Sequence, residues 1–490
     1  MTRARLESRQ GSAVALPRGL SVRRLTLPVS WTALGPVFAW LAFGVLIVAT
    51  AAIAFWAAAQ PSILVPRSTA SFPGWLAGPL HGLFGSLPHS QSTLEFGFSA
   101  VLVGMTGAYV IALLAVRTVS MRALWIVVGV LAALLLLTPP LQLTDFFNYL
   151  GYARLGALHG LNPYTHVIGE IPRDPVYLFS TWHGLHSPYS ELFTALTYPL
   201  GLLSLPLAYW IFKVAVVLGG IGCLMATAAA ARRLRQDARL AVAVVGLNPV
   251  FLVYAIGGFH LDVVMLCAMT AAIAVFLAGR GRAGGALMVV AAGIKVTGLL
   301  VLPFMVLGAR TREQGVRVLT GAVIAAIPLA AMSFLLFGAT VPNVSDQTQI
   351  LTPFSIPNLV GLALGVGGGT HTVIRALQLV VILVAAYQLI RLLLQRDRDW
   401  IAAAGWTTLA LIASASWLMP WYMIWLLPLA ALARRPGLRV VAVALTLFLV
   451  LTLGPDTTYV LGRNKINLLN TPAGRASTTL THELTSGPGP

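Results

Sequence analysis

Residues 143–166 read LTDFFNYLGYARLGALHGLNPYTH and place an acid, Asp145, shortly after the apolar run ALLLLTPP. The chain has only 14 acidic residues, so a carboxylate at the mouth of such a run needs an explanation. Phe146, Phe147 and Tyr149 follow it, and a carboxylate in these half-apolar surroundings suits a general base. In the alternative interpretation, Asp145 only caps the helix that follows, because aspartate is a good N-cap residue.

A second pair of ionisable residues, His260 and Asp262, ends the stretch NPVFLVYAIGGFHLD. Gly257 and Gly258 precede the pair and let the backbone bend or approach a ligand closely. Ionisable residues at membrane depth usually have a function, so we predict a substrate-binding turn, with a polar turn at the interface as the alternative. Two potential ligands are too few for a metal site, and the other histidines are scattered, so we expect neither a metal nor a cofactor.

Lys295 in AAGIKVTGLLVLPF is one of only three lysines in the chain. An ammonium group inside the membrane is costly unless it is paired, and the phosphate of a lipid headgroup would pair it. The alternative is that the side chain reaches up to the membrane interface. That alternative fits Lys213 better, because Lys213 lies on a long ordinary apolar span.

The stretch SASWLMPWYMIWLLPLAAL, residues 414–432, is rich in aromatic side chains. Trp417, Trp421, Tyr422 and Trp425 belong either to an aromatic belt at the membrane interface or to a platform for a sugar ring or a polyprenyl chain. The sequence leaves both interpretations open.

The composition identifies the elements that must position these residues. With 58% hydrophobic and 9% charged residues and a mean hydropathy of +0.85, the chain has too little polar surface for a soluble globule of this length. The net charge of +18 comes mostly from arginine clusters between apolar spans, which is the positive-inside pattern of membrane proteins. We therefore predict a multi-pass protein of the plasma membrane and expect no nucleic-acid partner.

Alternating the basic clusters on one side predicts an all-α protein with about 13 transmembrane helices. Residues 283–308 and 401–433 are each flanked by basic clusters, so each is expected to be a hairpin that enters and leaves on the same side. The predicted parts are a cytoplasmic basic tail (1–30), one transmembrane domain (31–455) with extracytoplasmic loops at 141–190 and 339–371, and an extracytoplasmic tail (456–490).

The order of the motifs TPP, TDFFNYLGYARLGALHGLNPYTH, SPYSELFTAL, NPVFLVYAIGGFHLD, GIKVTGLLVLPF and SWLMPWYMIWLLPLAAL resembles that of the GT-C membrane glycosyltransferases. The resemblance is closest to the actinobacterial polyprenol-phosphomannose-dependent alpha-(1→6)-mannosyltransferases and covers about residues 125–435. Two departures are Leu261, where those relatives carry Asn, and FNYLGYARLG, where they favour SYAAQGR.

The resemblance implies a GT-C-like fold with an extracytoplasmic catalytic loop, and an inverting enzyme. It would move a sugar, expected to be mannose, from a polyprenyl phosphate to a lipid-linked or glycan acceptor on the extracytoplasmic face. Asp145 matches the catalytic aspartate of the family. Tyr149, Asn162 and Tyr164 match the rest of the loop signature. His260 and Asp262 match a turn of the relatives that resembles Gly-Gly-x-His-x-Asp.

The implied chemistry agrees with these residues. A sugar phosphate already has a good leaving group, so one carboxylate that deprotonates the acceptor hydroxyl suffices, without a general acid. Cations near the leaving phosphate would stabilise its charge, and the candidates are Lys295, Arg154 and Arg375. A polytopic transporter or lipid flippase is the alternative class, and a structural membrane subunit is a third.

Overall fold

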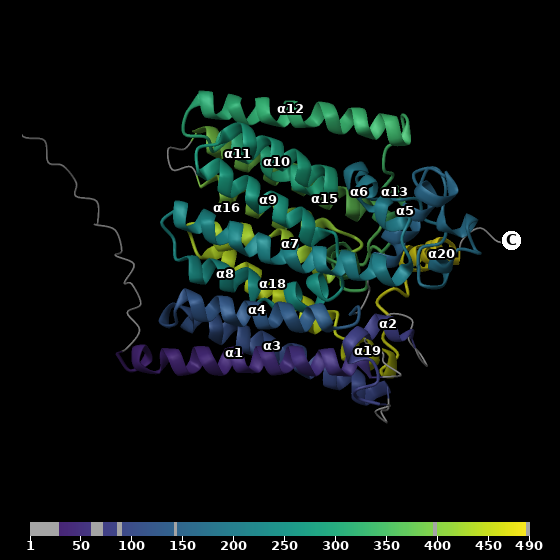
Figure 1. Cartoon of the computed structure of the whole chain (residues 1–490), viewed down its shortest axis with the longest axis horizontal. Helices are drawn as coiled ribbons and strands as arrows, with labels where there is room; N and C mark the ends of the chain where they lie inside the picture. The colour runs from purple at the N-terminus through teal and green to yellow at the C-terminus, as the bar shows by residue number, and fades with distance from the viewer. Residues whose placement is uncertain (1–28, 60–71, 86–90, 142–144, 395–398, 487–490) are drawn as a thin grey trace, which may run out of the picture.

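The protein is described by a computed structural model that covers residues 29–59, 72–85, 91–141, 145–394 and 399–486. Among these residues the chain forms helices and no strand, which confirms the all-α prediction. The longer helices run side by side along one axis (Figure 1). They are α1 (Val29–Ala58), α3 (Gln91–Ala115), α4 (Met121–Leu137), α7 (Leu205–Arg233), α9 (Asp262–Leu277), α12 (Arg312–Phe337), α15 (His371–Leu394), α16 (Trp400–Ser414) and α18 (Gly437–Thr452).

The described helices are apolar enough for a membrane. Five of them have the length and hydropathy to cross it, and a sixth is formed by α8 (Ala238–Gly246) with the π-helical segment η5 (Val250–Ile256) across a bend of 51°. Seven shorter apolar helices accompany them. These elements are the segments that the charge pattern singled out, while the number that cross the membrane is still a prediction.

Both expected hairpins are broken helices. The first consists of α10 (Gly281–Ile294), the 3-10 segment η6 (Val296–Val301) and α11 (Leu302–Leu307), with the break at Lys295. A Cβ atom placed on Gly298 would lie 3.0 Å from the Ala291 backbone, whereas seven residues of continuous helix span about 10 Å. The chain therefore turns back on itself at Lys295.

The second hairpin begins with α16 and continues through an extended stretch into η7 (Pro420–Trp425) and α17 (Leu427–Leu432). The returning arm packs beside α16, because a Cβ atom on Gly405 would lie 3.4 Å from the Leu429 Cβ. Both hairpins interrupt apolar helices with an irregular segment, which a membrane tolerates only where protein or a cavity surrounds it. The segment of the second hairpin is buried or half-buried, whereas Val296 and Leu299 of the first are exposed.

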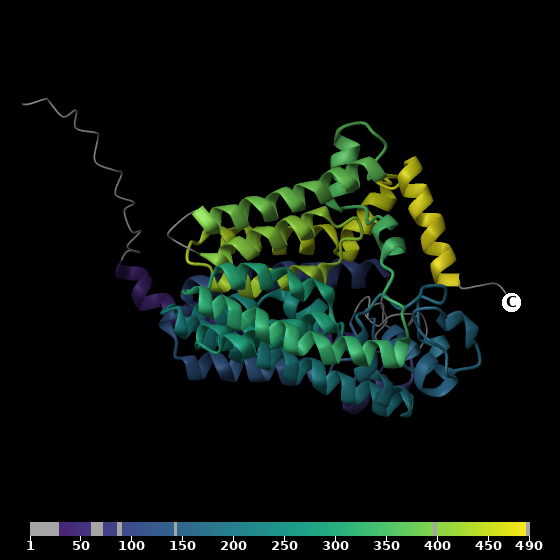
Figure 2. The same cartoon turned by 90° about the horizontal axis from the view of Figure 1, so that it is seen from above.

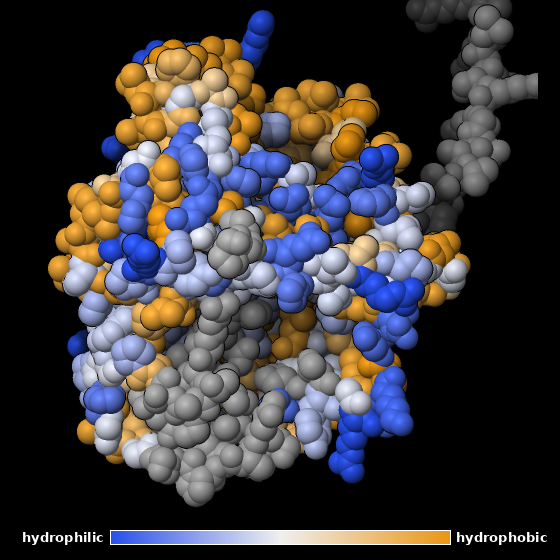
Figure 3. Space-filling model, turned by 90° about the vertical axis from the view of Figure 1, so that its right-hand side faces the viewer, coloured by the Kyte–Doolittle hydropathy of each residue, from blue (hydrophilic) through white to orange (hydrophobic). Residues whose placement is uncertain are grey.

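Short helices gather at one end of the bundle, which we call the α5 end. It contains α5 (Phe146–His159), α6 (Glu191–Gly201), α13 (Ser345–Gln349) and α20 (Pro472–Ser486) (Figures 1 and 2). Hydrophilic residues spread across this end, with hydrophobic surface at its margins (Figure 3). The C-terminal helix is fixed here by hydrogen bonds from Gly184 N to Leu484 O, 2.8 Å, and from Leu351 N to Ser477 Oγ, 2.7 Å.

Lys213 does not reach the surface of the protein, so the expectation that it extends to the membrane interface is wrong. Its side chain is fully buried, and Nζ donates to the Thr138 carbonyl at 2.6 Å. The ammonium also lies 4.2 Å from the centre of the Trp210 ring, a cation–π contact. Thr138 ends α4, so its carbonyl has no partner inside that helix, and Lys213 supplies one.

Candidate active site

Asp145 occupies the N-cap position of α5, at the point where the chain leaves α4 for the α5 end. Its carbonyl accepts hydrogen bonds from Asn148 N and Tyr149 N, but its carboxylate makes no capping hydrogen bond. The side chain is 21% exposed, so a substrate can reach it. The carboxylate therefore does not perform the task that the alternative interpretation assigned to it.

His260 lies opposite this carboxylate at the end of an unusual backbone segment. The π-helical segment η5 comes directly before Gly257, and Phe259 adopts a left-handed φ of 55°, which is rare for a non-glycine residue. π-Helical turns and strained residues of this kind are found often at functional sites. Gly258 is required beside the ring, since a Cβ there would lie 2.8 Å from His260 Nε2.

Two hydrogen bonds join the Asp145 segment to the His260 turn. Leu141 N donates to Gly257 O at 2.8 Å, and Leu261 N donates to Tyr149 Oη at 3.4 Å. As a result, His260 Nδ1 lies 3.4 Å from Asp145 Oδ2, longer than a good hydrogen bond but close enough for a charge contact. Within the described residues, neither ring nitrogen of this buried histidine has a hydrogen-bond partner.

Asp262, two residues beyond this histidine, forms an ion pair with Lys295. The Lys295 Nζ lies 2.7 Å from Asp262 Oδ1. Trp425 also donates its Nε1–H to Asp262 Oδ1 at 2.6 Å. Asp262 is 1% exposed, whereas the Lys295 side chain is 20% exposed. An ammonium group has three donors, so Lys295 can bind a second acceptor while it stays paired with Asp262.

Aromatic rings of the second hairpin fill the space between these two pairs. The Trp421 ring stacks on His260 with centroids 3.6 Å apart, and Tyr422 stacks on Trp425 at 4.6 Å. Lys295 Nζ lies 5.0 Å from the centres of the Tyr422 and Trp425 rings. Asp145, His260, the three aromatic residues, Asp262 and Lys295 thus form one chain of contacts, which we call the Asp145–Lys295 wall.

Asn162 and Tyr164, also predicted as site residues, anchor the loop that follows α5. Asn162 Nδ2 donates to Phe337 O at 2.8 Å, and Tyr164 Oη donates to Thr194 Oγ1 at 2.9 Å. The Tyr164 ring also packs edge-on against Phe337 at 5.0 Å. These contacts tie the loop to the last turn of α12 and to α6.

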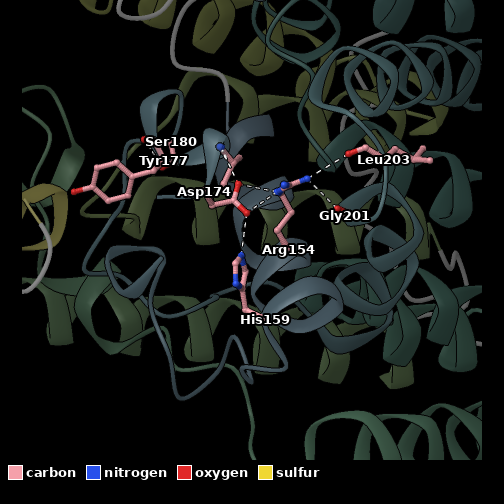
Figure 4. Close-up of polar contacts among 8 residues, drawn as sticks. Arg154, His159, Asp174, Tyr177, Ser180, Gly201 and Leu203 are labelled. Atoms are coloured by element: carbon pink, nitrogen blue, oxygen red, sulfur yellow. Dashed lines mark hydrogen bonds and ion pairs between the residues drawn. The ribbon is translucent and has the colours of Figure 1, made fainter. Parts of the chain in front are cut away.

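Arg154 lies about two and a half turns along α5 from Asp145 and has protein partners of its own. Its Nε is 2.8 Å from Asp174 Oδ1, and its Nη1 donates to Gly201 O at 3.0 Å. His159 Nε2 also contacts Asp174, at 2.9 Å from Oδ2, so the carboxylate lies between two basic side chains (Figure 4). The structure does not bring Arg154 to the Asp145–Lys295 wall.

Arg375 and Trp417 take no part in the contacts that make up the wall. Arg375 is exposed near the start of α15, whereas Trp417 packs edge-on against Trp182 at 5.1 Å, where α20 covers the loop. No group of three metal-binding side chains occurs among the described residues. The absence of a metal or cofactor from the reaction is still a prediction.

Asp174, Arg154 and His159 form a cluster that we expect to stabilise the loop at residues 160–180 in a pH-dependent way. Burial raises the pKa of Asp174, but hydrogen bonds from His159, from the Val176 amide and from Arg154 outweigh burial, so the pKa lies below its ordinary value. A lowered folded-state pKa stabilises the loop above the unfolded-state pKa, about 4, and this stabilisation is lost as the pH falls through the lowered value. Asp174→Asn should therefore speed amide hydrogen exchange in residues 160–180 at pH 7, and the difference from the parent should shrink as the pH falls below about 4.

The matched control for that experiment is Asp346→Asn, because Asp346 is half-buried on α13 and its one hydrogen bond among the described residues is with Ser345 Oγ, at 3.4 Å. The control should leave exchange in residues 160–180 unchanged. Equal exchange in the Asp174→Asn variant and the parent at pH 7 would show that the cluster does not order the loop.

Sequence reasoning missed two contributors to the site and its surroundings. Trp425 was noted among the aromatics but not assigned to the site, although it shares its segment with Trp421 and Tyr422. Asn148 accepts the amides of Thr181 and Trp182 on Oδ1, both at 3.0 Å, and so fixes the far part of the loop against α5. An asparagine among Phe and Tyr at the start of a helix was the signal available for it, since a buried amide needs partners.

Two models of known protein families match this chain. Residues 69–311 match the family model "Alpha-(1->6)-mannopyranosyltransferase, N-terminal domain", and residues 354–471 match the model "MptB C-terminal domain". Together the two matches cover most of the chain. The first contains the charged residues and the histidine of the Asp145–Lys295 wall, which are Asp145, His260, Asp262 and Lys295. The aromatic residues of the wall lie inside the second.

Two curated relatives carry the same activity in their names. Alpha-(1->6)-mannopyranosyltransferase A of Mycobacterium tuberculosis is 27% identical over 364 residues, which cover 66% of this chain and 67% of the relative. Alpha-(1->6)-mannopyranosyltransferase B of Corynebacterium glutamicum is 24% identical over 368 residues, which cover 65% of this chain and 60% of the relative. No solved structure gives a significant match.

Proposed function

Because the chain belongs to the family of alpha-(1->6)-mannopyranosyltransferases, which are glycosyltransferases, we propose that it moves mannose from a polyprenyl phosphate to a lipid-linked or glycan acceptor. The matched regions span about two thirds of the length of the curated relatives or less, so the donor and the acceptor are part of the proposal. The proposed place of the reaction is the extracytoplasmic face of the plasma membrane, with the α5 end outward.

The Asp145–Lys295 wall is the observation that carries this proposal. A carboxylate stands at one end of it and an ammonium group at the other, and both side chains are about one fifth exposed. Glycosyl transfer from a sugar phosphate needs these two charges: a base for the acceptor hydroxyl and a cation for the departing phosphate. The rings of Trp421 and Tyr422 between them suit the apolar face of a sugar.

In the proposed reaction, Asp145 takes the proton of the acceptor hydroxyl as the oxygen attacks C1 of mannose. The new C1–O bond forms on one face while the bond from C1 to the phosphate oxygen breaks on the other, so the configuration inverts. The phosphate leaves with the bonding electron pair, and Lys295 stabilises its charge. No acid is needed to protonate the leaving group, in contrast to glycoside hydrolysis.

The surroundings of Lys295 support a lipid-linked donor. Val296 and Leu299, on the segment that follows Lys295, are 63% and 42% exposed although they lie in an apolar hairpin. A prenyl chain would cover such side chains while its phosphate reaches the ammonium group. Asp262 would hold Lys295 in place for this contact.

The purified protein in liposomes, given polyprenyl phosphate bearing radiolabelled mannose and an extract of lipid-linked glycans, should move the label into the glycan fraction. The reason is that the proposed site needs only a donor, an acceptor and its own side chains. Movement of the intact labelled lipid across the bilayer without transfer of the sugar would instead indicate a flippase and contradict the proposal.

A further inference from the structure

A cavity of about 780 Å³ lies at the end of the bundle opposite Asp145. The last turn of α9, the α11–α12 turn, Trp400 at the start of α16 and Arg434 after α17 contribute to its lining. The distance from the proposed catalytic site follows from α12. This helix begins beside the cavity and ends at Phe337, which contacts Tyr164 at the α5 end, and its 26 residues span about 39 Å.

The cavity is strongly basic. Arg310, Arg317 and Arg434 line it, and Glu313 is the only acid among the described residues of its lining. An adjoining cavity of about 530 Å³ shares Glu313 and Arg317 and adds Arg280 and Arg282. Glu313 pairs with Arg317, whereas no described carboxylate forms an ion pair with Arg280, Arg282 or Arg310.

The walls of the cavity are fixed by packing and hydrogen bonds. Phe276 packs edge-on against Trp400 at 5.5 Å, and Gly308 leaves room for the Trp400 ring, which a Cβ atom there would strike. Asp399 Oδ2 accepts the Arg434 amide at 2.9 Å, and Gln314 Oε1 accepts the Arg310 amide at 3.0 Å. The backbone that carries two of the arginines is therefore held by side chains next to it.

We propose that this cavity is a binding site for the phosphate group of an amphipathic ligand, separate from the sugar-transfer site. Arginine forms paired hydrogen bonds with phosphate oxygens, and several guanidinium groups around one cavity favour a doubly or singly charged phosphate over a neutral group. Phe276, Leu277 and Trp400 offer an apolar wall for the rest of the molecule. The volume suits a small headgroup.

Arginines at this end also serve membrane topology, but topology requires only charge near the membrane. It does not require a cavity with a fixed aromatic wall beside the charges. Basic pockets between transmembrane helices bind phospholipid headgroups in this way. The phosphate can belong to an anionic lipid or to a soluble phosphate compound, and the experiment below separates these sources. The inference does not depend on the proposed sugar transfer.

The full-length protein in phosphatidylcholine–detergent micelles is heated with increasing phosphatidylglycerol, and separately with inorganic phosphate. Phosphatidylglycerol should raise the unfolding temperature of the parent, and Arg310→Gln with Arg434→Gln should weaken its apparent affinity by at least about tenfold. The matched control is Arg122→Gln, because Arg122 is exposed at the start of α4 and does not line the cavity. Arg310→Lys with Arg434→Lys keeps the charge and should retain part of the affinity.

Stabilisation by phosphatidylglycerol that depends on the two arginines supports a lipid headgroup. Stabilisation by inorganic phosphate that depends on the same two arginines also supports the site, and indicates that the phosphate group belongs to a soluble compound. Two results would overturn the proposal: neither addition stabilises the parent, or Arg122→Gln weakens the effect as much as the cavity variants do. The second result would mean that the positive charge of this end attracts anionic lipid without a specific site in the cavity.

Discussion

Asp145→Asn should lower the rate of sugar transfer by a factor of about 10² to 10⁴ while folding and donor binding stay close to those of the parent. Asparagine keeps the size of the side chain but cannot accept the proton of the acceptor hydroxyl. The fold should tolerate the change, because the carboxylate makes no capping hydrogen bond and, among the described residues, its one close polar contact is His260 Nδ1 at 3.4 Å. Initial rates with labelled donor, at matched amounts of folded protein, measure the effect.

Glu170→Gln is the matched control for this experiment. Glu170 lies in the loop that follows α5 and also contacts a histidine, His166, at 2.7 Å, but it is not part of the Asp145–Lys295 wall. The control should transfer sugar at close to the parental rate. If Asp145→Asn keeps the parental rate and Asp262→Asn or Glu170→Gln is inactive, the base lies elsewhere.

The elements of the fold were predictable because charge and hydropathy act locally. Apolar runs of membrane length, separated by arginine clusters, identify helices and hairpins without any knowledge of tertiary contacts. The break at Lys295 was predictable for the same reason, since the segment between its basic ends is too short for two full helices. How many helices cross the membrane depends on their tilt and on their neighbours, which local patterns do not contain.

The pairing of the site residues was not predictable from these patterns. Asp145 and His260 are far apart in sequence, and their contact depends on two hydrogen bonds between α5 or its approach and the turn after η5. The sequence also suggested an external phosphate as the partner of Lys295, whereas the structure pairs Lys295 with Asp262. The spacing of residues along the sequence does not predict that Asp262 contacts Lys295, because the contact forms only when the chain folds back.

Arg154 is the opposite case, because it is close to Asp145 in sequence but not in the structure. A cation close to Asp145 in sequence was a reasonable candidate for the donor phosphate. Nine residues of helix carry it away from Asp145, however, and Asp174 returns through the loop to pair with it. Its role toward the donor is therefore less well supported by the contacts than that of Lys295, whose partners all belong to the wall.

Lys295→Met should weaken binding of the polyprenyl phosphate donor by about 10- to 100-fold, because it removes a charge-assisted contact to the phosphate. The single variant also leaves Asp262, which is 1% exposed, with the Trp425 N–H as its remaining hydrogen-bond partner among the described residues. An uncompensated buried carboxylate is costly, so the variant should also be less stable, by about 2 kcal/mol or more. Loss of binding in this variant alone would not separate the two effects.

The double variant Asp262→Asn with Lys295→Met separates them. It removes both charges, so most of the lost stability should return, since replacing a buried ion pair by neutral groups is often nearly neutral. Donor binding should stay weak, because nothing has replaced the ammonium group. Donor affinity, measured by equilibrium binding of labelled polyprenyl phosphate mannose, and the unfolding temperature are compared across the parent, both single variants and the double variant. If the double variant recovers parental affinity together with stability, Lys295 serves only to neutralise Asp262, and the cation that meets the donor phosphate must be another residue.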